Sequence, residues 1–425
     1  MTPEVKQRIE QIRQGIVPEG YVKDKDGIYP RDWASKKIGQ WLKLAERSIV
    51  LQDEEEYQLV TIRRGFGGVD SRGSFLGKNV LVKNYFIVKT GDFIISKRQI
   101  AHGACGIVPP ELDGAVVSNE YNVFLPQDGT NIQMFNLMMQ LPHYKRLFYL
   151  MSDGVHIEKL LFKTQDWMKR TLAMPLLKEQ KKIAEILSTQ DKAIELQERK
   201  IEELKRFKKG CLEKMFPRKG QKVPETRFPG FTGDWEQRKA KELFVSTADK
   251  GYPELPVLSA TQDRGMIRRD ENGINIFHDK KNEAGYKRVL PGQFVIHLRS
   301  FQGGFAHSAI EGITSPAYTV FGFSEPEKHD SEYWKYVFTS KSFIQRLETV
   351  TYGIRDGRSI SYEEFLTLGF VYPSKAEQTA IARYLDKLSD LITLHQRKLE
   401  EMKRQKKALM QLLLTGIVKT KGKVR

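Results

Sequence analysis

The chain has 425 residues, which is enough for two or three domains that each bury a sizeable core. Its 70 lysine and arginine residues outnumber 53 aspartate and glutamate residues, so the formal net charge is +17 and the expected partner is a polyanion, nucleic acid above all. Two cysteines, no signal-peptide pattern and no run of about 18 apolar residues exclude a disulfide scaffold and favour a cytoplasmic protein. Charge alone leaves open a basic protein without such a partner.

The first part of the chain is predicted to be a short helix followed by a globular domain. Residues 1–17 contain a helical pattern from Pro3 to Ile16, to which the sequence assigns no role. Residues 18–174 hold segments rich in Val, Ile, Phe and Tyr, such as 91–95, which is the composition of strands. Together with a helical pattern from Asn131 to Tyr149, they predict a mixed α/β domain with a curved sheet.

A long charged helix is predicted over residues 175–216. No proline follows Pro175 within it, and apolar residues recur every seven positions among glutamate, lysine and arginine. An apolar stripe this narrow is stable only against another helix. The segment 216–224 contains proline and glycine, so it is predicted to end the helix and form a linker.

The second half of the chain follows the same order. Residues 217–372 are predicted to form a second mixed α/β domain, with a helical pattern from Ser331 to Glu348. A second long helix is predicted over residues 373–418, and residues 419–425 form a basic tail that is expected to fray.

The two halves are an internal duplication. Glu179-Gln180 recurs as Glu377-Gln378, an offset of 198 residues (377 minus 179), and the two long helices match at that offset without a gap. Arg199-Lys200 recurs in the same way as Arg397-Lys398. The domains before the helices match more loosely, as expected for two copies that share a fold and differ in surface.

The most available partner for each long helix is its own copy, so the two are predicted to pair as an antiparallel coiled coil. The predicted seam residues are Leu187, Ile194, Ile201, Leu204, Leu385, Ile392, Leu399 and Met402. Gln197 and His395 occupy equivalent polar places in the seam, where they are expected to help set the register. His395 is therefore interpreted as a seam residue and not as a ligand or a base.

The sequence motifs of enzymes that act on DNA are missing. The chain has no Gly-Lys-Ser/Thr phosphate loop, no Asn/Asp-Pro-Pro-aromatic tetrad of an amino-methyltransferase and no Gly-x-Ser-x-Gly elbow. Glu203-Leu204-Lys205 resembles the end of a nuclease motif but is interpreted as helix surface charge. Gly65-Phe66-Gly67-Gly68 is interpreted as a mobile glycine-rich loop and not as a dinucleotide site. Because no histidine pairs occur at zinc spacing, no metal or cofactor is expected.

Basic residues and glutamine gather with glycine in the turns between predicted strands. Arginine can donate two hydrogen bonds to guanine in the major groove and glutamine can pair with adenine, while glycine lets the backbone approach phosphate. The predicted DNA-contacting residues are Arg63, Arg64, Arg72, Lys97, Arg98 and Gln99 in the first domain, and Arg264, Arg268, Arg269, Arg299, Gln302, Arg355 and Arg358 in the second. At each single position, a solvated basic loop is the alternative.

Taken together, these features make the chain resemble the specificity subunit of a type I restriction-modification system over essentially its whole length. The resemblance rests on the order domain, helix, domain, helix and on the Pro-x-x-x-Glu-Gln-x-x-Ile-Ala-x-x-Leu segments at Pro175 and Pro373. The Arg-Lys-hydrophobic-Glu-Glu-hydrophobic-Lys-Arg segments at Arg199 and Arg397 add to it, as does the run from Phe228 to Trp235.

The resemblance implies a non-catalytic subunit with two target-recognition domains, each of which reads one half of a split, asymmetric target in double-stranded DNA. It also implies that the paired helices act as a spacer and dock two methyltransferase subunits, through which a restriction and translocase subunit joins the complex. Base-contacting positions vary within this family, so the residues predicted above rest on their chemistry alone.

Two other interpretations stay open at this point. A self-sufficient methyltransferase or nuclease with a disguised site would show turnover by the purified chain alone. A coiled-coil scaffold without a DNA role predicts that charge reversal at Arg63, Arg264 and Arg299 leaves DNA binding of the assembled complex unchanged.

Overall fold

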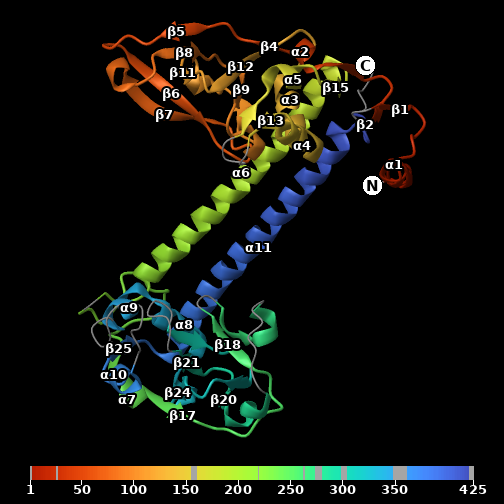
Figure 1. Cartoon of the computed structure of the whole chain (residues 1–425). Coiled ribbons are helices and arrows are strands. Elements are labelled where there is room, and N and C mark those ends of the chain that lie inside the picture. The colour runs from red at the N-terminus through yellow and green to blue at the C-terminus, as the bar shows by residue number, and fades with distance from the viewer. Residues whose placement is uncertain are drawn as a thin grey trace. The chain divides into compact units, whose positions relative to one another are not determined.

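The computed structural model describes residues 2–24, 27–154, 160–218, 220–261, 264–272, 280–297, 304–347 and 361–420. The chain divides into two compact units: unit 1 comprises Met1–Gln197 and Lys398–Arg425, and unit 2 comprises Glu198–Arg397. Each unit contains a globular part and one half of each long helix (Figure 1). Within the described ranges, no helix combines the length and the hydropathy that a bilayer crossing requires.

Unit 1 holds fifteen strands and five short helices among its described residues. The strands are β1 (Tyr21–Asp24), β2 (Gly27–Pro30), β3 (Ala34–Lys37), β4 (Leu42–Leu44), β5 (Ser48–Val50), β6 (Glu56–Ile62), β7 (Val69–Leu76), β8 (Asn84–Ile87), β9 (Phe93–Ser96), β10 (Cys105–Ile107), β11 (Val116–Ser118), β12 (Tyr121–Pro126), β13 (Ser152–Asp153), β14 (Leu161–Phe162) and β15 (Thr171–Met174). The short helices are α1 (Pro3–Arg13), α2 (Ile38–Trp41), α3 (Ile132–Met139), α4 (Pro142–Leu150) and α5 (Thr164–Met168).

Two sheets form the centre of unit 1, in the orders β10-β9-β12-β4 and β5-β8-β11-β6-β7. The first is antiparallel, whereas β11 of the second runs parallel to β6. Strand β9 is buried on both faces, because Phe93 and Ile95 join the core under the helices while Ile94 packs in a second cluster with Val60 and Val69. This double burial explains why the segment is apolar without alternation.

Unit 2 has the same kind of fold as unit 1 but contains fewer strands among its described residues. Its strands are β16 (Glu236–Lys239), β17 (Phe244–Thr247), β18 (Leu258–Thr261), β19 (Gly265–Arg268), β20 (Lys287–Val289), β21 (Phe294–Ile296), β22 (Phe305–His307), β23 (Gly312–Thr314), β24 (Thr319–Phe323) and β25 (Gly369–Tyr372). Its short helices are α7 (Ala240–Leu243), α8 (Ser331–Thr339), α9 (Lys341–Leu347) and α10 (Tyr362–Phe365).

The main sheet of unit 2, β17-β24-β21-β22, has the topology of the first sheet of unit 1. Phe294 and Ile296 again face the core under the helices, and Val295 faces the opposite cluster. The pairs β18-β19 and β20-β23 take the place of the second sheet, and a parallel bridge between Val257 and Ile313 links them as β6 and β11 are linked in unit 1. The mixed α/β class predicted for both domains is therefore confirmed.

The two long helices are α6 (Leu177–Lys214) and α11 (Lys375–Leu414), and they pack against each other (Figure 1). In unit 1, Glu179 accepts a hydrogen bond from the Thr420 amide at 3.2 Å, and further along α6 Asp191 pairs with Lys406 at 2.5 Å. As the residue number rises from Glu179 to Asp191 along α6, the number of the residue in contact falls from Thr420, just beyond α11, to Lys406 within it. The packing is therefore antiparallel, as predicted. In unit 2 the repeat-equivalent lysine, Lys208, contacts the side chain of α11 residue Ser389 at 2.7 Å.

The predicted seam residues are buried or half-buried. Leu187 and Leu385 are fully buried, and Ile201 is 4 % exposed. In unit 1 Leu187 packs with Leu413 and Leu414 of α11. Ile392, Leu399 and Met402 are half-buried, because one charged helix pair covers each seam residue less completely than a globular core does.

The glutamine of the repeated Glu-Gln pair attaches each long helix to its domain. Gln180 donates to the carbonyls of Pro175 and Gly129 and accepts from the amide of Asn131, which caps α3. Gln378 donates to the carbonyl of Pro373 and accepts from the amide of Asp330, which caps α8. Both glutamines are fully buried, so each motif fixes the angle between a long helix and the adjoining helix.

Several predicted helix boundaries were wrong by a few residues, and two predicted helices are each divided. The helix expected from Asn131 to Tyr149 is two, α3 and α4, because Pro142 lacks an amide proton and starts a new helix. The helix expected from Ser331 to Glu348 also divides, because Ser340 caps the start of α9 through its hydroxyl. The N-terminal helix ends at Arg13, before Gly15 with its left-handed φ of 76°.

Candidate nucleic-acid interface

The hairpin β6–β7 of unit 1 carries three of the predicted DNA-contacting residues. Arg63 and Arg64 begin its turn, and Arg72 projects from β7; all three are exposed. Arg63 is held in place, because its side chain pairs with Asp70 across the hairpin and its amide donates to the carbonyl of Gly68 at 3.0 Å. The hairpin therefore presents arginines on a defined backbone.

The turn of this hairpin is anchored to another turn of the same unit. The amide of Gly65 donates to the carbonyl of His102 at 2.7 Å, and the amide of Phe66 donates to the carbonyl of Gly103 at 2.8 Å. His102 ends the short 3₁₀ helix η2 (Ile100–His102). The glycine-rich loop, which its composition predicts to be mobile, is thus hydrogen-bonded to the chain around η2.

This anchoring joins the two basic clusters predicted in the first domain, because Lys97, Arg98 and Gln99 immediately precede η2. Arg98 forms an ion pair with Glu120 at 2.6 Å and keeps about half of its side chain exposed. The Gln99 side-chain oxygen is buried without a hydrogen-bond partner, so this side chain faces inward. Arg98 is the better placed of the two to reach a ligand, and both stay predictions as DNA contacts.

In unit 2 the hairpin β18–β19 occupies the corresponding place and presents Arg264 and Arg268. A Cβ on Gly265 would overlap the carbonyl oxygen of His307 in β22, so the hairpin can approach that strand only with glycine there. Gly265 also has a left-handed φ of 68°. Arg268 lies 3.5 Å from Asp270 and is half exposed, whereas Arg269 is half-buried with Nε and one terminal nitrogen unpaired.

Four other predicted contacts, Arg299, Gln302, Arg355 and Arg358, lie outside the described residues.

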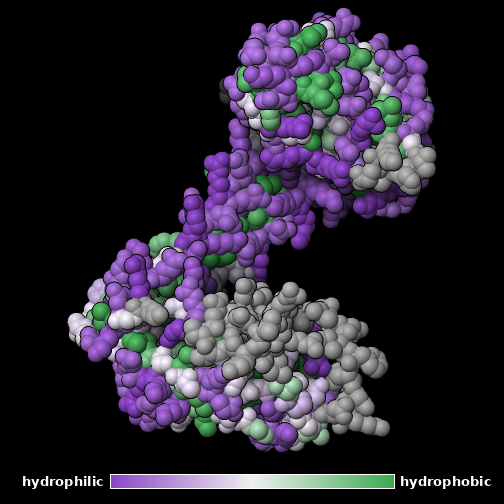
Figure 2. All heavy atoms as spheres, turned by 60° about the vertical axis from the view of Figure 1, so that its left-hand side comes forward, coloured by the Kyte–Doolittle hydropathy of each residue, from purple (hydrophilic) through white to green (hydrophobic). Residues whose placement is uncertain are grey.

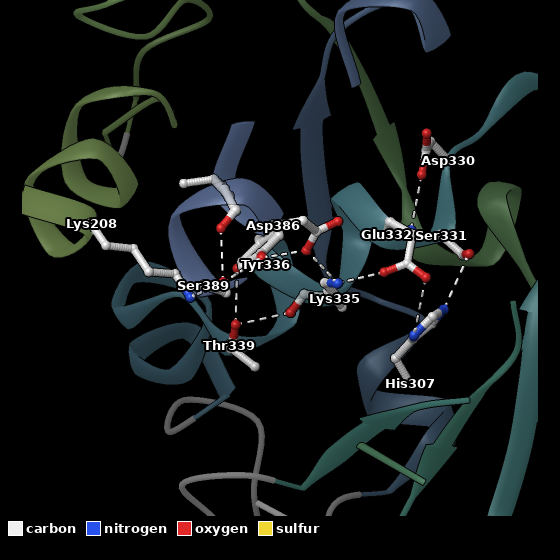
Figure 3. A network of polar contacts seen from close by, with 11 residues as sticks. Lys208, His307, Asp330, Ser331, Glu332, Lys335, Tyr336, Thr339, Asp386 and Ser389 are labelled. Atoms are coloured by element: carbon white, nitrogen blue, oxygen red, sulfur yellow. Dashed lines mark hydrogen bonds and ion pairs between the residues drawn. The ribbon is translucent and has the colours of Figure 1, made fainter. Parts of the chain in front are cut away.

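A polar network in unit 2 connects α8 with both long helices (Figure 3). Lys335 of α8 lies 2.5 Å from Glu332 and 2.7 Å from Asp386 of α11, and Tyr336 donates to the same aspartate at 2.6 Å. Lys208 of α6 reaches Ser389 of α11, and its ammonium lies 5.3 Å from the centre of the Tyr336 ring. These contacts hold α8 against the pair of long helices within this unit.

Burial and charge act differently on the two lysines of this network. Burial lowers the pKa of Lys208, and the nearby ammonium of Lys335 adds to that effect. Burial also works against the charged form of Lys335, but its hydrogen bonds to Asp386 and Glu332 outweigh burial and raise its pKa. At the far end, His307 shares a hydrogen bond of 3.1 Å with Ser331, and burial lowers the pKa of its ring.

Sequence reasoning missed the residues that position these turns. The glycine composition of residues 65–68 predicts a mobile loop and assigns no role to Phe66. An aromatic residue among three glycines is nevertheless a signal for a turn whose ring packs against another segment of the chain. Gly103, which receives the Phe66 ring, and Lys145, which lies beside that ring, carry no such signal. Their role appears only when the chain is folded.

The exposed surface is polar on the face shown in Figure 2, where hydrophobic residues are scattered among hydrophilic ones over the described atoms. Together with the excess of 17 positive charges, such a surface suits a charged and hydrated ligand.

Residues 30–206 match the family model described as the type I restriction modification DNA specificity domain. The type I restriction enzyme MjaVIII specificity subunit of Methanocaldococcus jannaschii is 24% identical over 426 residues, which cover 92% of this chain and 94% of that one. Over nearly its whole length the chain is therefore similar to the specificity subunits of type I restriction enzymes. A second relative from that organism, named for the MjaX enzyme, is 22% identical over 95% of this chain and 97% of its own length.

Solved structures share the fold of this chain. The S subunit of a type I restriction-modification system from M. genitalium has a TM-score of 0.51 at 12% identity and covers 92% of this chain and 97% of its own. A chain from a structure that addresses complex assembly and conformational transition of the type I R-M system has a TM-score of 0.57 at 16% identity, with 92% and 99% covered. These likenesses support the arrangement of two globular parts and two long helices.

Proposed function

We propose that this specificity subunit reads a bipartite, asymmetric DNA target, with the globular part of each unit contacting one half. The observation that carries the proposal is that both units build the same four-stranded sheet and place an arginine-bearing hairpin against its edge strand, β10 or β22. The hairpins differ in sequence, with Arg63-Arg64-Gly65 in one and Arg264-Gly265 in the other. A common frame with different side chains suits two readers of different half-sites.

The long helices are proposed to set the spacing of the half-sites and to dock two methyltransferase subunits, through which a restriction and translocase subunit joins. With 38 and 40 residues, each helix is about 57–60 Å long, which exceeds the ~34 Å of one turn of DNA. Gln180 and Gln378 are buried, and each attaches the globular part of its own unit to a long helix through the same kind of hydrogen bond. The chain itself is proposed to be non-catalytic.

The decisive experiment maps methylated bases in the genome of a host that carries this chain with its methyltransferase partners, and in the same host without it. The expected result is one enriched motif of two short half-sites separated by a fixed spacer. Purified complex should bind that motif selectively, and binding should weaken steeply with salt because phosphate contacts release counterions.

Replacing Arg264 with alanine should degrade one half of the motif while the other half is still read, and Arg63→Ala should do the opposite. An undivided motif, or methylation that is independent of this chain, would overturn the proposal. Turnover by the purified chain alone would overturn its non-catalytic part.

A further inference from the structure

The β6–β7 turn contains a backbone conformation that its side chain does not favour. Phe66 has a φ of 62°, and no other non-glycine residue of the described ranges has a positive φ. An aromatic residue is disfavoured in the left-handed region because its Cβ crowds the backbone. Such a conformation persists only where the surroundings hold it, and it is found most often at functional sites.

Four contacts hold Phe66 in this conformation. Its own amide and that of Gly65 donate to the carbonyls of Gly103 and His102. Its ring lies directly over Gly103, where a Cβ would come within 2.6 Å of Cε2 of the ring. The ammonium of Lys145, on α4, lies 4.8 Å from the centre of the ring.

These contacts join two basic turns that are distant in the sequence. Arg63 and Arg64 precede Phe66 by three and two residues, and Lys97 to Gln99 precede the η2 helix, whose C-cap Gly103 lies under the ring. If the ring were removed, its contacts with Gly103 and Lys145 would be lost, while the backbone hydrogen bonds from Gly65 and Phe66 to the chain around η2 could still form. The ion pair of Arg63 with Asp70 would remain, but the turn that carries both arginines contains three glycines and would be less restrained than with the ring in place.

We propose that Phe66 is a positioning residue for DNA recognition: its ring, seated on Gly103, fixes the orientation in which Arg63 and Arg64 meet the bases of one half-site. This inference rests on the proposed function and adds to it a residue that is not itself a base reader. Loss of the ring is expected to lower the discrimination between base pairs at that half-site, while contacts with phosphate persist.

The test measures recognition of each half-site separately. The full chain, assembled with its methyltransferase partners, is exposed to a library of duplexes in which each half of the wild-type motif is randomised in turn. Phe66→Ala is expected to lose about tenfold in discrimination at one or more positions of one half-site, which is the size of a typical single base-pair preference. Discrimination at the other half-site and the dependence of affinity on salt should stay as in the wild type.

Two further variants separate positioning from stability. Phe66→Tyr keeps the ring and should retain wild-type discrimination. Gly103→Ala keeps the Phe66 side chain but puts a methyl group within 2.6 Å of its ring, at a position whose φ of 74° alanine also disfavours; it should displace the ring and reproduce the loss at the same half-site. Phe75→Ala is the matched control, because Phe75 is a partly exposed ring on β7 that pairs with Tyr57 at the end of the same hairpin remote from the turn; it should discriminate as the wild type does.

The outcomes distinguish this inference from the function on which it rests. If the wild-type complex reads no bipartite motif, the proposed function fails. If the wild type reads its motif and Phe66→Ala reads it equally well, or binds all duplexes more weakly by one common factor, Phe66 is not a positioning residue. If Phe66→Ala does not fold, the contrast between Gly103→Ala and Phe66→Tyr decides, because equal discrimination in those two variants would also overturn the inference.

Discussion

In the repeated Glu-Gln pair, the glutamine has the same kind of partner in units 1 and 2, whereas the glutamate does not. The glutamine has nearly the same role in both, because its bonds are mostly to backbone groups that the shared fold puts in the same place. The glutamate does not. Glu377 is 2 % exposed and receives two hydrogen bonds from the Arg227 guanidinium, at 2.6 and 2.8 Å, whereas Glu179 is half-buried and accepts one from the backbone of Thr420.

The difference comes from the segment that follows each helix. After α6 the chain continues through a linker that brings Arg227 to Glu377, and after α11 the chain reaches its basic tail beside Glu179. A repeated side chain whose partner is backbone therefore keeps its role in both copies. A repeated side chain whose partner is another side chain depends on sequence outside the repeat.

The largest predicted effect tests this contrast directly. Glu377→Ala should lower the free energy of unfolding of unit 2 by about 3–5 kcal/mol, because it leaves the mostly buried Arg227 guanidinium without its carboxylate. Glu179→Ala should cost unit 1 less, about 1.5 kcal/mol, since the single hydrogen bond that is lost joins a backbone amide to a half-buried carboxylate and leaves no buried charge unpaired. Hydrogen exchange resolved by unit measures both.

A matched control is the double variant Arg227→Met, Glu377→Met, which removes both charges and should recover much of the lost stability. Equal destabilisation by Glu377→Ala and Glu179→Ala would contradict the contrast between the two glutamates.

The glutamines should behave alike. Gln180→Ala and Gln378→Ala each leave a buried amide of a helix cap unpaired, that of Asn131 or Asp330, so each should cost its own unit about 1–3 kcal/mol. Urea unfolding of each variant, followed by unit-resolved exchange, provides the measurement. Gln405→Ala, at an exposed position of α11, is the control and should change stability by less than about 0.5 kcal/mol. A large effect in only one unit would show that the two attachments are not equivalent.

A third prediction concerns acid. Burial lowers the pKa of both His307 and His329 in unit 2, although Glu332 opposes the effect at His307 and Glu236 opposes it at His329. A folded-state pKa below the unfolded value of about 6.5 stabilises the fold above that pH, and the stabilisation is lost as the pH falls through the folded-state pKa. Unit 2 should therefore lose protection from exchange below about pH 6.5.

The comparison variant for that experiment is His307→Gln with His329→Gln, which cannot gain the charge. Its stability at pH 7.5 should be lower than that of the wild type, and its decline toward pH 5 should be shallower. An unchanged slope would mean that other groups cause the acid sensitivity.

The smallest effect is chemical and leaves stability unchanged. Cys105 is 1 % exposed and burial raises the pKa of its thiol, whereas Cys211 on α6 is half-buried. A thiol reagent at pH 8 should modify Cys211 in the native chain and both cysteines in denaturant. Mass spectrometry counts the labels, and Cys211→Ser should abolish native labelling; rapid native modification of Cys105 would show that unit 1 opens readily.

Much of the fold could be predicted because the repeat and the hydrophobic periods are local signals. The long helices follow from heptads without internal proline, and β9 follows from an apolar run bounded by glycine and a turn. Boundaries failed where a single residue decided them, as Pro142 and Ser340 did. Of the predicted DNA contacts, Arg63 and Lys97 lie in turns that the structure joins, yet nothing local relates position 63 to position 97.

The duplication, the antiparallel helix pair and the residue chemistry that suits DNA could all be predicted from the sequence, since they depend on composition and on spacing along the chain. The contact of the Phe66 ring with Gly103, the pairing of Arg227 with Glu377 and the inward orientation of the Gln99 side-chain oxygen are visible only in the folded chain. Each of these depends on contacts between segments that the sequence does not align with one another. Their geometry is set by the packing of the sheets and helices that separate them.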